Sequence, residues 1–146
     1  MTRVTFHFGA DDKWHYASRL LRKATQNGAK VAVVAHSSDV ARVDADLWAL
    51  APTEFVPHCL SDAAASVLRR SPVVIAACEG SAKKLDGSVL LNLSGDIPVG
   101  FDAYERLIEV VSIDETERQQ ARMRWKHYAG AGLTIEKHDI QNQGAR

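Results

Sequence analysis

Two short, uninterrupted apolar runs constrain the fold of this chain more than any other feature. Residues 31–35 read Val-Ala-Val-Val-Ala, and the run from Pro72 to Ala77 is similarly apolar. Such runs are typical of strands buried on both faces, which occur mainly in parallel sheets covered by helices. Helical patterns stand between the strand-like segments. The sequence therefore predicts a three-layer α/β/α, Rossmann-like domain with a mostly parallel central sheet.

Strand and helix patterns alternate along the rest of the chain, and we expect one domain over residues 1–146. Strands are predicted at 4–8, 31–35, 55–56, 72–77, 89–93 and 107–112, with an edge strand at 134–137. Helices are predicted from a cap at Asp11 or Asp12 through Lys23, from Ser37, Ser38 or Asp39 to just before Pro52, and over 61–69. The longest helix is predicted over 116–130 after a cap at Asp114-Glu115, and one helical turn is predicted within 97–104. Residues 141–146 are expected to form a frayed tail.

Composition excludes several classes of function. The formal net charge is zero, with 18 basic and 18 acidic residues, whereas proteins that wrap duplex DNA usually carry a positive excess. The N-terminus lacks a secretory signal pattern, and no apolar run approaches the roughly 20 residues of a membrane helix. We expect a cytoplasmic protein that does not bind membranes. Its two cysteines, Cys59 and Cys78, are expected to be reduced core residues.

The sequence carries no coherent catalytic, cofactor or metal motif. After the first predicted strand, Gly9-Ala10-Asp11-Asp12 places two carboxylates where a nucleotide phosphate would sit. The six histidines show no paired ligand spacing. His36 follows a buried strand, a position where α/β enzymes often place catalytic groups, so a small enzyme with a site near His36 remains an alternative. The favoured prediction is a protein without catalytic residues, cofactors or metal.

One candidate docking surface lies near the end of the second predicted helix. Trp48 is followed shortly by Phe55, Pro57 and His58. Proline cannot donate to a sheet ladder, so Pro57 belongs at a strand end or edge. Aromatic anchors dominate the energetics of protein interfaces. An apolar docking patch is therefore predicted at a sheet margin, although burial of Trp48 in the core is an equally good interpretation.

A second candidate surface lies on the last predicted helix. Arg118, Arg122 and Trp125 fall on one face at spacings of four and three, with Lys126 beside them, whereas Arg124 points elsewhere. A solvated basic face explains such a run. The alternative is a site for an acidic peptide end, in which cations pair with carboxylates and Trp125 holds a hydrophobic side chain. Single-stranded nucleic acid stacked on Trp125 is a further possibility.

Three ordered segments carry a family resemblance: Val-Asp-Ala-Asp-Leu-Trp at 43–48, Glu-Phe-Val-Pro-His-Cys-Leu at 54–60, and the basic-aromatic run at 120–128, followed by Ala131-Gly132. They resemble segments of the chi subunit family of bacterial DNA polymerase III holoenzyme. The first is similar to that family's Leu-Asp-Glu-x-Leu-Trp and the second to its Phe-Val-Pro-His-x-Leu. The third matches its Ala-Arg-x-Arg-aromatic-Lys-x-Tyr, with Trp125 where a tyrosine is usual. The resemblance extends over most of the chain.

The resemblance implies a non-catalytic accessory subunit of the clamp loader. One surface of such a protein binds the psi subunit, and another binds the acidic C-terminal tail of single-stranded DNA-binding protein, so contact with DNA is mainly indirect. By matched motif, the tail site falls on Arg122, Trp125 and Lys126, with Arg118 as a helper. The psi-facing patch falls on Trp48, Phe55, Pro57 and His58. The resemblance also allows a helicase partner at that patch.

Overall fold

The computed structural model describes residues 2–49, 56–78 and 87–140. Seven strands form one sheet in the order β3-β4-β2-β5-β6-β1-β7. Every strand pairing is parallel. The elements in chain order are β1 (Arg3–Ala10), α1 (Lys13–Gln26), β2 (Val31–Ala35), α2 (Ser37–Trp48), β3 (His58–Leu60), α3 (Ala65–Arg70), β4 (Val73–Ala77), β5 (Val89–Asn92), the 3-10 turn η1 (Phe101–Ala103), β6 (Arg106–Ser112), α4 (Glu115–Gly130) and β7 (Thr134–Asp139). The predicted α/β architecture is confirmed.

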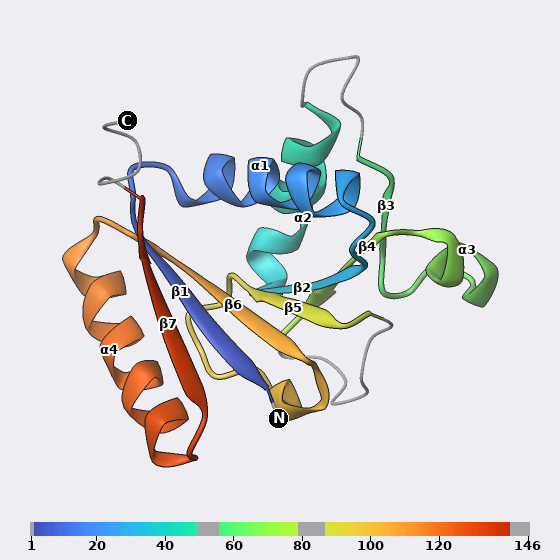
Figure 1. Ribbon diagram of the computed structural model, residues 1–146. Helices are drawn as coiled ribbons and strands as arrows, with labels where there is room; N and C mark the ends of the chain where they lie inside the picture. The colour runs from blue at the N-terminus through green and yellow to red at the C-terminus, as the bar shows by residue number, and fades with distance from the viewer. Residues whose placement is uncertain (1, 50–55, 79–86, 141–146) are drawn as a thin grey trace.

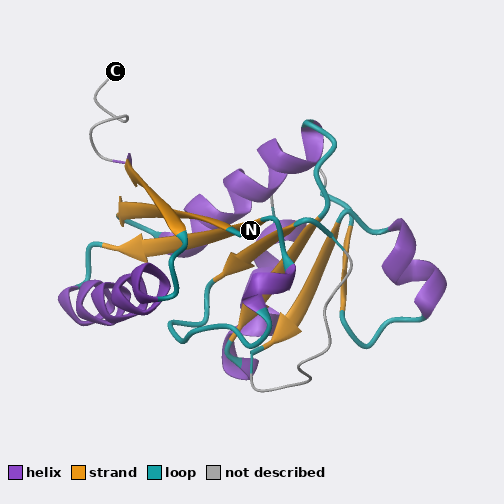
Figure 2. Cartoon of the chain, turned by 60° about the horizontal axis from the view of Figure 1, so that its bottom comes forward, coloured by secondary structure: helices purple, strands orange, loops and turns teal. Residues whose placement is uncertain are grey.

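Helices cover both faces of this sheet, and each face has its own apolar core. Side chains alternate along β2, so Val31 and Val33 face α1 and α2, whereas Ala32 belongs to the core beneath α4. Figure 1 shows α4 on the opposite side of β1 and β6 from α1, with α3 at the far end of the sheet. Figure 2 shows the strands between these layers. This arrangement places α4 over the β1 and β7 end of the sheet.

Local sequence explains where the two longest helices begin. The Asp12 carboxylate accepts hydrogen bonds from the backbone amides of Trp14 and His15, which starts α1 as predicted. The Asp114 carboxylate accepts one from the Glu117 amide at the start of α4, also as predicted. Acidic residues in the first turn of α4 further suit the helix dipole. The sequence therefore fixes the start of the helix that carries the candidate tail site.

Three predicted boundaries differ from the structure. The strand predicted at 55–56 is wrong in its described part, because Val56 is buried without being in a strand and β3 begins at His58, after Pro57. Proline cannot supply a ladder donor, which explains that start. Helix α2 is capped by the backbone of His36 rather than by a serine or Asp39 side chain. Helix α3 begins at Ala65, later than the predicted 61.

Both cysteines are half-buried and neither is in a disulfide, which corrects the expectation that they are core residues. Cys59 lies in the edge strand β3, and Cys78 follows β4. In the described part of the chain, no helix is both long and apolar enough to span a bilayer. Of the positions named in the sequence predictions, Pro52, Phe55 and the tail at 141–146 lie outside the described residues.

His7 connects the sheet to α1 and makes folding sensitive to acid. Its Nδ1 lies 2.6 Å from the Tyr16 hydroxyl, and its ring stacks at a tilt 4.7 Å from that of His138. Burial, with smaller effects of His138 and Arg106, lowers the pKa of His7 from 6.5 to about 4. Between pH 6.5 and about pH 4, His7 is therefore protonated in the unfolded chain but largely neutral in the folded protein. The contribution of His7 to stability is therefore fully present above pH 6.5 and is lost as the pH drops toward 4.

We predict that His7→Gln reduces this acid sensitivity, because glutamine keeps a polar partner for Tyr16 but does not titrate. The stability of the unmodified protein should fall by up to roughly 3 kcal/mol more than that of the variant as the pH approaches 4. Urea unfolding between pH 7 and 4 measures the difference. Exposed His15 provides the matched control, His15→Gln. Parallel stability curves for His7→Gln and the unmodified protein would contradict the prediction.

Candidate functional site

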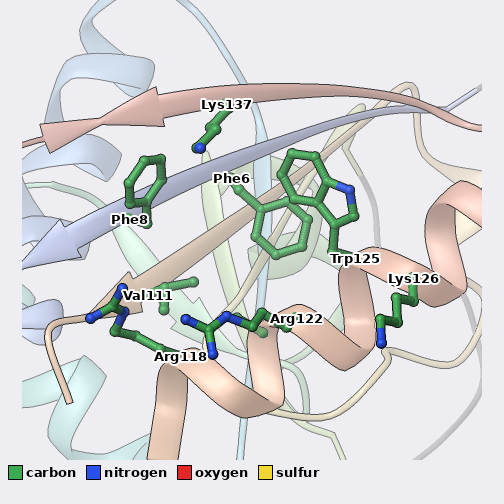
Figure 3. Close-up of a pocket in the computed structure, with 9 residues that line it drawn as sticks. Phe6, Phe8, Val111, Arg118, Arg122, Trp125, Lys126 and Lys137 are labelled. Carbon is green, nitrogen blue, oxygen red and sulfur yellow. The ribbon is translucent and has the colours of Figure 1, made fainter. Parts of the chain in front are cut away.

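A pocket of about 490 Å³ opens between α4 and the strands β1, β6 and β7. Its lining residues are Phe6, Phe8, Val111, Arg118, Ala121, Arg122, Trp125, Lys126 and Lys137. The structure thus brings together all four residues predicted for the tail site. Figure 3 shows Trp125 beside Phe6, with Phe8 at the other end of the pocket. The pocket combines an aromatic floor with a cationic rim.

The aromatic floor follows from strand periodicity and helix packing. Phe6 and Phe8 are two residues apart on β1, so both side chains face α4. Phe6 is buried, and its ring centroid lies 5.0 Å from that of Trp125 at an interplanar angle of 42°. This tilted contact holds the indole against the sheet, in the range where aromatic pairs attract. Trp125 remains half-buried, so part of its surface is available to a ligand.

Among the described residues that line the pocket, four are cations, Arg118, Arg122, Lys126 and Lys137, and none is a carboxylate. Arg118 and Arg122 approach Glu115 at 3.6 and 3.7 Å, but all three side chains are at least half exposed. Such exposed pairs contribute little and are readily exchanged for a better partner. Figure 3 shows Lys137 reaching toward the pocket from β7, across from the two arginines. The arrangement suits a ligand with an apolar end and carboxylates.

Sequence reasoning missed Phe6, Phe8 and Lys137. The alternation over residues 4–8 had identified a strand, and the spacing of the two phenylalanines could have marked one aromatic face. Lys137 comes from the edge strand β7, where its Nζ lies 5.0 Å from the centre of the Phe8 ring. Only the pairing of β7 with β1 brings it there, because Lys137 is opposite Phe6 in the register. No pattern in the sequence reveals that neighbour.

A buried polar network beneath the pocket fixes α4 to the sheet. Glu109 on β6 is fully buried and accepts hydrogen bonds from the Tyr128 hydroxyl at 2.6 Å and the Asn92 amide at 2.9 Å. Nε of Arg124 lies 3.2 Å from the same carboxylate, and its Nη1 donates to the Gly95 carbonyl at 2.7 Å. Arg124 therefore points into the protein, away from the pocket, as its position in the helix predicted.

Burial dominates the titration of this network. It raises the pKa of Glu109 above the usual value, against the opposing effects of the Arg124 guanidinium and the hydrogen bonds from Tyr128 and Asn92. Burial and the neighbouring Glu109 carboxylate also raise the pKa of the Tyr128 hydroxyl, which therefore stays protonated and can donate. Burying these polar groups costs free energy, but their contacts are specific, because Tyr128 and Arg124 of α4 both meet the Glu109 carboxylate.

The second candidate surface lies at the opposite edge of the sheet. Trp48 ends α2 and is 61% exposed, so the interpretation as a core residue is wrong. Its ring meets that of His58 edge-on, with centroids 5.2 Å apart. The His58 imidazole is buried, with Nε2 2.9 Å from the Asp44 carboxylate and Nδ1 2.7 Å from the Val56 carbonyl. The buried His58 ring therefore packs against the exposed Trp48 ring and holds it in position.

Pro57 is exposed beside this pair, and Phe55 lies outside the described residues. Leu60 on β3 and Val67 on α3 are further exposed apolar side chains at this end of the molecule. Strand β3 is one edge of the sheet and β7 is the other, with five strands between them. The Trp48 surface and the α4 pocket are consequently separate regions at opposite edges of one sheet.

Comparison with known proteins identifies the family. The family described as DNA polymerase III chi subunit, HolC, matches residues 1–136. The chain belongs to this family. Its family resemblance, inferred from the motifs around Trp48 and Trp125, is confirmed. As a member of the chi family, it is a replication accessory subunit of DNA polymerase III and part of a multi-protein complex.

Individual relatives agree with this assignment. A DNA polymerase III subunit chi of Pseudomonas aeruginosa is 30% identical over 147 residues, covering 96% of this chain and 98% of that protein. One of Haemophilus influenzae is 29% identical over 125 residues, covering 85% of each. Among solved structures, yeast Dbp5 bound to Gle1 and IP6 superposes with a TM-score of 0.62. Its 11% identity, over 94% of this chain and 41% of that one, indicates a shared fold alone.

We predict that Arg124→Met destabilises the protein strongly, because it leaves Glu109 buried without its cation. The expected loss is about 3 kcal/mol. Arg122→Met is the matched control, since Arg122 is 61% exposed and its loss should change stability by less than about 0.5 kcal/mol. Urea unfolding of both variants measures the difference. Equal stability of the two variants would show that the network does not fix α4.

Proposed function

We propose that this chi-family protein is a non-catalytic adaptor that links the clamp loader to single-stranded DNA-binding protein in the cytoplasm. The observation that carries the proposal is the α4 pocket, with its aromatic floor and its rim of four cations without a carboxylate. The tail of single-stranded DNA-binding protein, as the family resemblance implies it, is acidic, and the aromatic floor suits a peptide with a hydrophobic end. Its chemistry is complementary to both parts of the pocket.

The proposed binding mode follows from the shape of the pocket. The terminal hydrophobic side chain packs on Phe6 and Trp125, and the acidic groups pair with Arg118 and Arg122. Each cation lies at the rim, where water and salt reach it, so affinity for one tail should be modest and salt-sensitive. Many tails are held close together on coated DNA. A weak contact then becomes an effective tether because a released tail is quickly replaced.

The Trp48 surface is proposed to bind the clamp-loader side through the psi subunit. Trp48 is 61% exposed, and its ring packs against His58, which is held by a hydrogen bond with Asp44. Exposed aromatic side chains in a fixed position are the residues that dominate the energetics of interfaces. Because this surface and the pocket lie at opposite sheet edges, both partners can be held at once. A helicase that uses the same surface would compete with psi.

Direct binding of single-stranded DNA is the alternative supported by a specific observation, since the pocket offers both aromatic rings and cations. The formal net charge of zero opposes it, because binding to a polyanion usually draws on an overall positive field. A competition experiment separates the two. An unlabelled single-stranded oligonucleotide should displace an acidic peptide only if DNA occupies the pocket itself.

We predict that Arg122→Ala and Lys126→Ala each weaken binding of the acidic tail peptide by at least about 10-fold, because each removes a charge-assisted contact. Fluorescence anisotropy with a labelled tail peptide at low and moderate salt provides the measurement. Exposed Arg19 on α1 offers a control with the same charge change, and Arg19→Ala should alter affinity by less than about 2-fold. If Arg19→Ala weakens peptide binding as much as the two pocket variants do, the loss of affinity reflects the overall charge of the protein and not contacts in the pocket. Absence of peptide binding at low salt would refute the tail site.

We predict that Trp48→Ala weakens binding to the psi subunit by about 30-fold while leaving tail-peptide affinity unchanged. Calorimetry with purified psi measures the first effect, and the anisotropy assay measures the second. Val99→Ala removes another exposed apolar side chain, 70% exposed, and serves as the control. If Trp48→Ala and Val99→Ala bind psi equally well, the Trp48 surface is not the psi site.

A further inference from the structure

Three metal-ligating side chains outside both docking surfaces meet at the carboxyl ends of neighbouring strands. His36 follows β2, Cys78 follows β4, and Asp96 lies in the turn after β5. Strand β2 lies between β4 and β5 in the sheet. One ligand atom from each side chain lies within 4.8 Å of the others. The sequence predicts no metal site, because its six histidines show no paired ligand spacing. Only the order of the strands brings these three residues together.

The backbone of each residue is held in place where its strand ends. The Cys78 amide donates to the Ala35 carbonyl at 2.8 Å, which extends the pairing of β2 with β4. The His36 carbonyl accepts from the Asp39 amide at 2.8 Å at the start of α2. The Asp96 carbonyl accepts from the Asn92 amide at 2.8 Å. Three fixed backbones that direct side chains to one point form a preorganised site.

The side chains already face one another. Nδ1 of His36 lies 3.5 Å from the Cys78 sulfur, and the other ring nitrogen, Nε2, lies 3.8 Å from the Asp96 carboxylate. Only one of these nitrogens can bind an ion, and with one ligand atom from each residue the largest separation is within 4.8 Å. The His36 and Asp96 side chains are 43% and 70% exposed, so both have room to rotate. Tetrahedral zinc, with bonds of about 2.0–2.3 Å, needs ligand atoms roughly 3.5 Å apart. Closing the largest separation therefore takes only about 1 Å of side-chain movement.

We propose that His36, Cys78 and Asp96 bind a zinc ion. Imidazole, thiolate and carboxylate together match the ligands of zinc, whereas magnesium and calcium avoid thiolate. Three protein ligands leave the fourth position for water or an exogenous group. The ion would join the ends of β2, β4 and β5, so binding should also raise the thermal stability of the protein. The site is independent of the proposed tail and psi contacts.

The test uses the full chain purified without a polyhistidine tag. Equilibrium dialysis against buffered zinc should give roughly one ion per chain. Cys78→Ser and His36→Ala should each weaken binding by at least about 10-fold. Cobalt in place of zinc should give thiolate-to-metal charge-transfer absorption that Cys78→Ser abolishes. Zinc should raise the melting temperature of the unmodified protein and leave that of Cys78→Ser unchanged.

Two controls make the outcome decisive. Cys59→Ser removes the other cysteine, which lies in β3 away from the site, and should bind zinc like the unmodified protein. Arg122→Ala, which alters the tail pocket, should also keep full zinc affinity. The proposal is overturned if Cys78→Ser binds zinc as tightly as the unmodified protein, or if Cys59→Ser loses binding equally. Neither result depends on whether the tail or psi assignment holds.

Discussion

The ionic contact of Arg124 with Glu109, deep beneath α4, is the interaction on which the rest of the structure depends. Fixing a fully buried carboxylate against one guanidinium, one tyrosine hydroxyl and one amide leaves α4 a single position over the sheet. That position sets the distance from Trp125 to Phe6 and turns Arg122 toward the pocket. A helix that packed through apolar contacts alone could shift along the sheet without such a penalty. The buried network thus gives the exposed pocket its shape.

Two surfaces on one small domain follow from the strand order. Strands β3 and β7 are the two edges of the sheet. The exposed Trp48 lies near the β3 edge, and Lys137 lies on β7 at the other edge. A parallel sheet with paired central strands is stiff, so binding at one edge need not disturb the other. For an adaptor, this separation matters more than affinity at either surface, because its proposed role depends on holding two partners together.

Much of this architecture can be predicted from the sequence. The physical reasons also explain which parts cannot be predicted. The uninterrupted run 31–35 has a pattern that suits only a covered strand, and Asp12 and Asp114 can satisfy the first amides of a helix. The cations of α4 were found because helical spacing is local. Lys137 was missed because its neighbours depend on strand pairing, and the His36 cluster was missed because three strand ends must meet before it exists. Local sequence patterns thus predict individual helices and strands. A site formed by residues from several of them can be predicted only when the order of the strands is known.

The independence of the two surfaces can be tested directly with the chain's three tryptophans, Trp14, Trp48 and Trp125. Each gives its own indole N–H signal in a proton–nitrogen NMR spectrum, and mutation assigns each signal. Titration with the acidic tail peptide should shift the Trp125 signal progressively while the Trp48 and Trp14 signals stay in place. A shift of Trp48 in step with Trp125, or of Trp48 alone, would contradict an adaptor that binds the tail at α4 and keeps its other surface free.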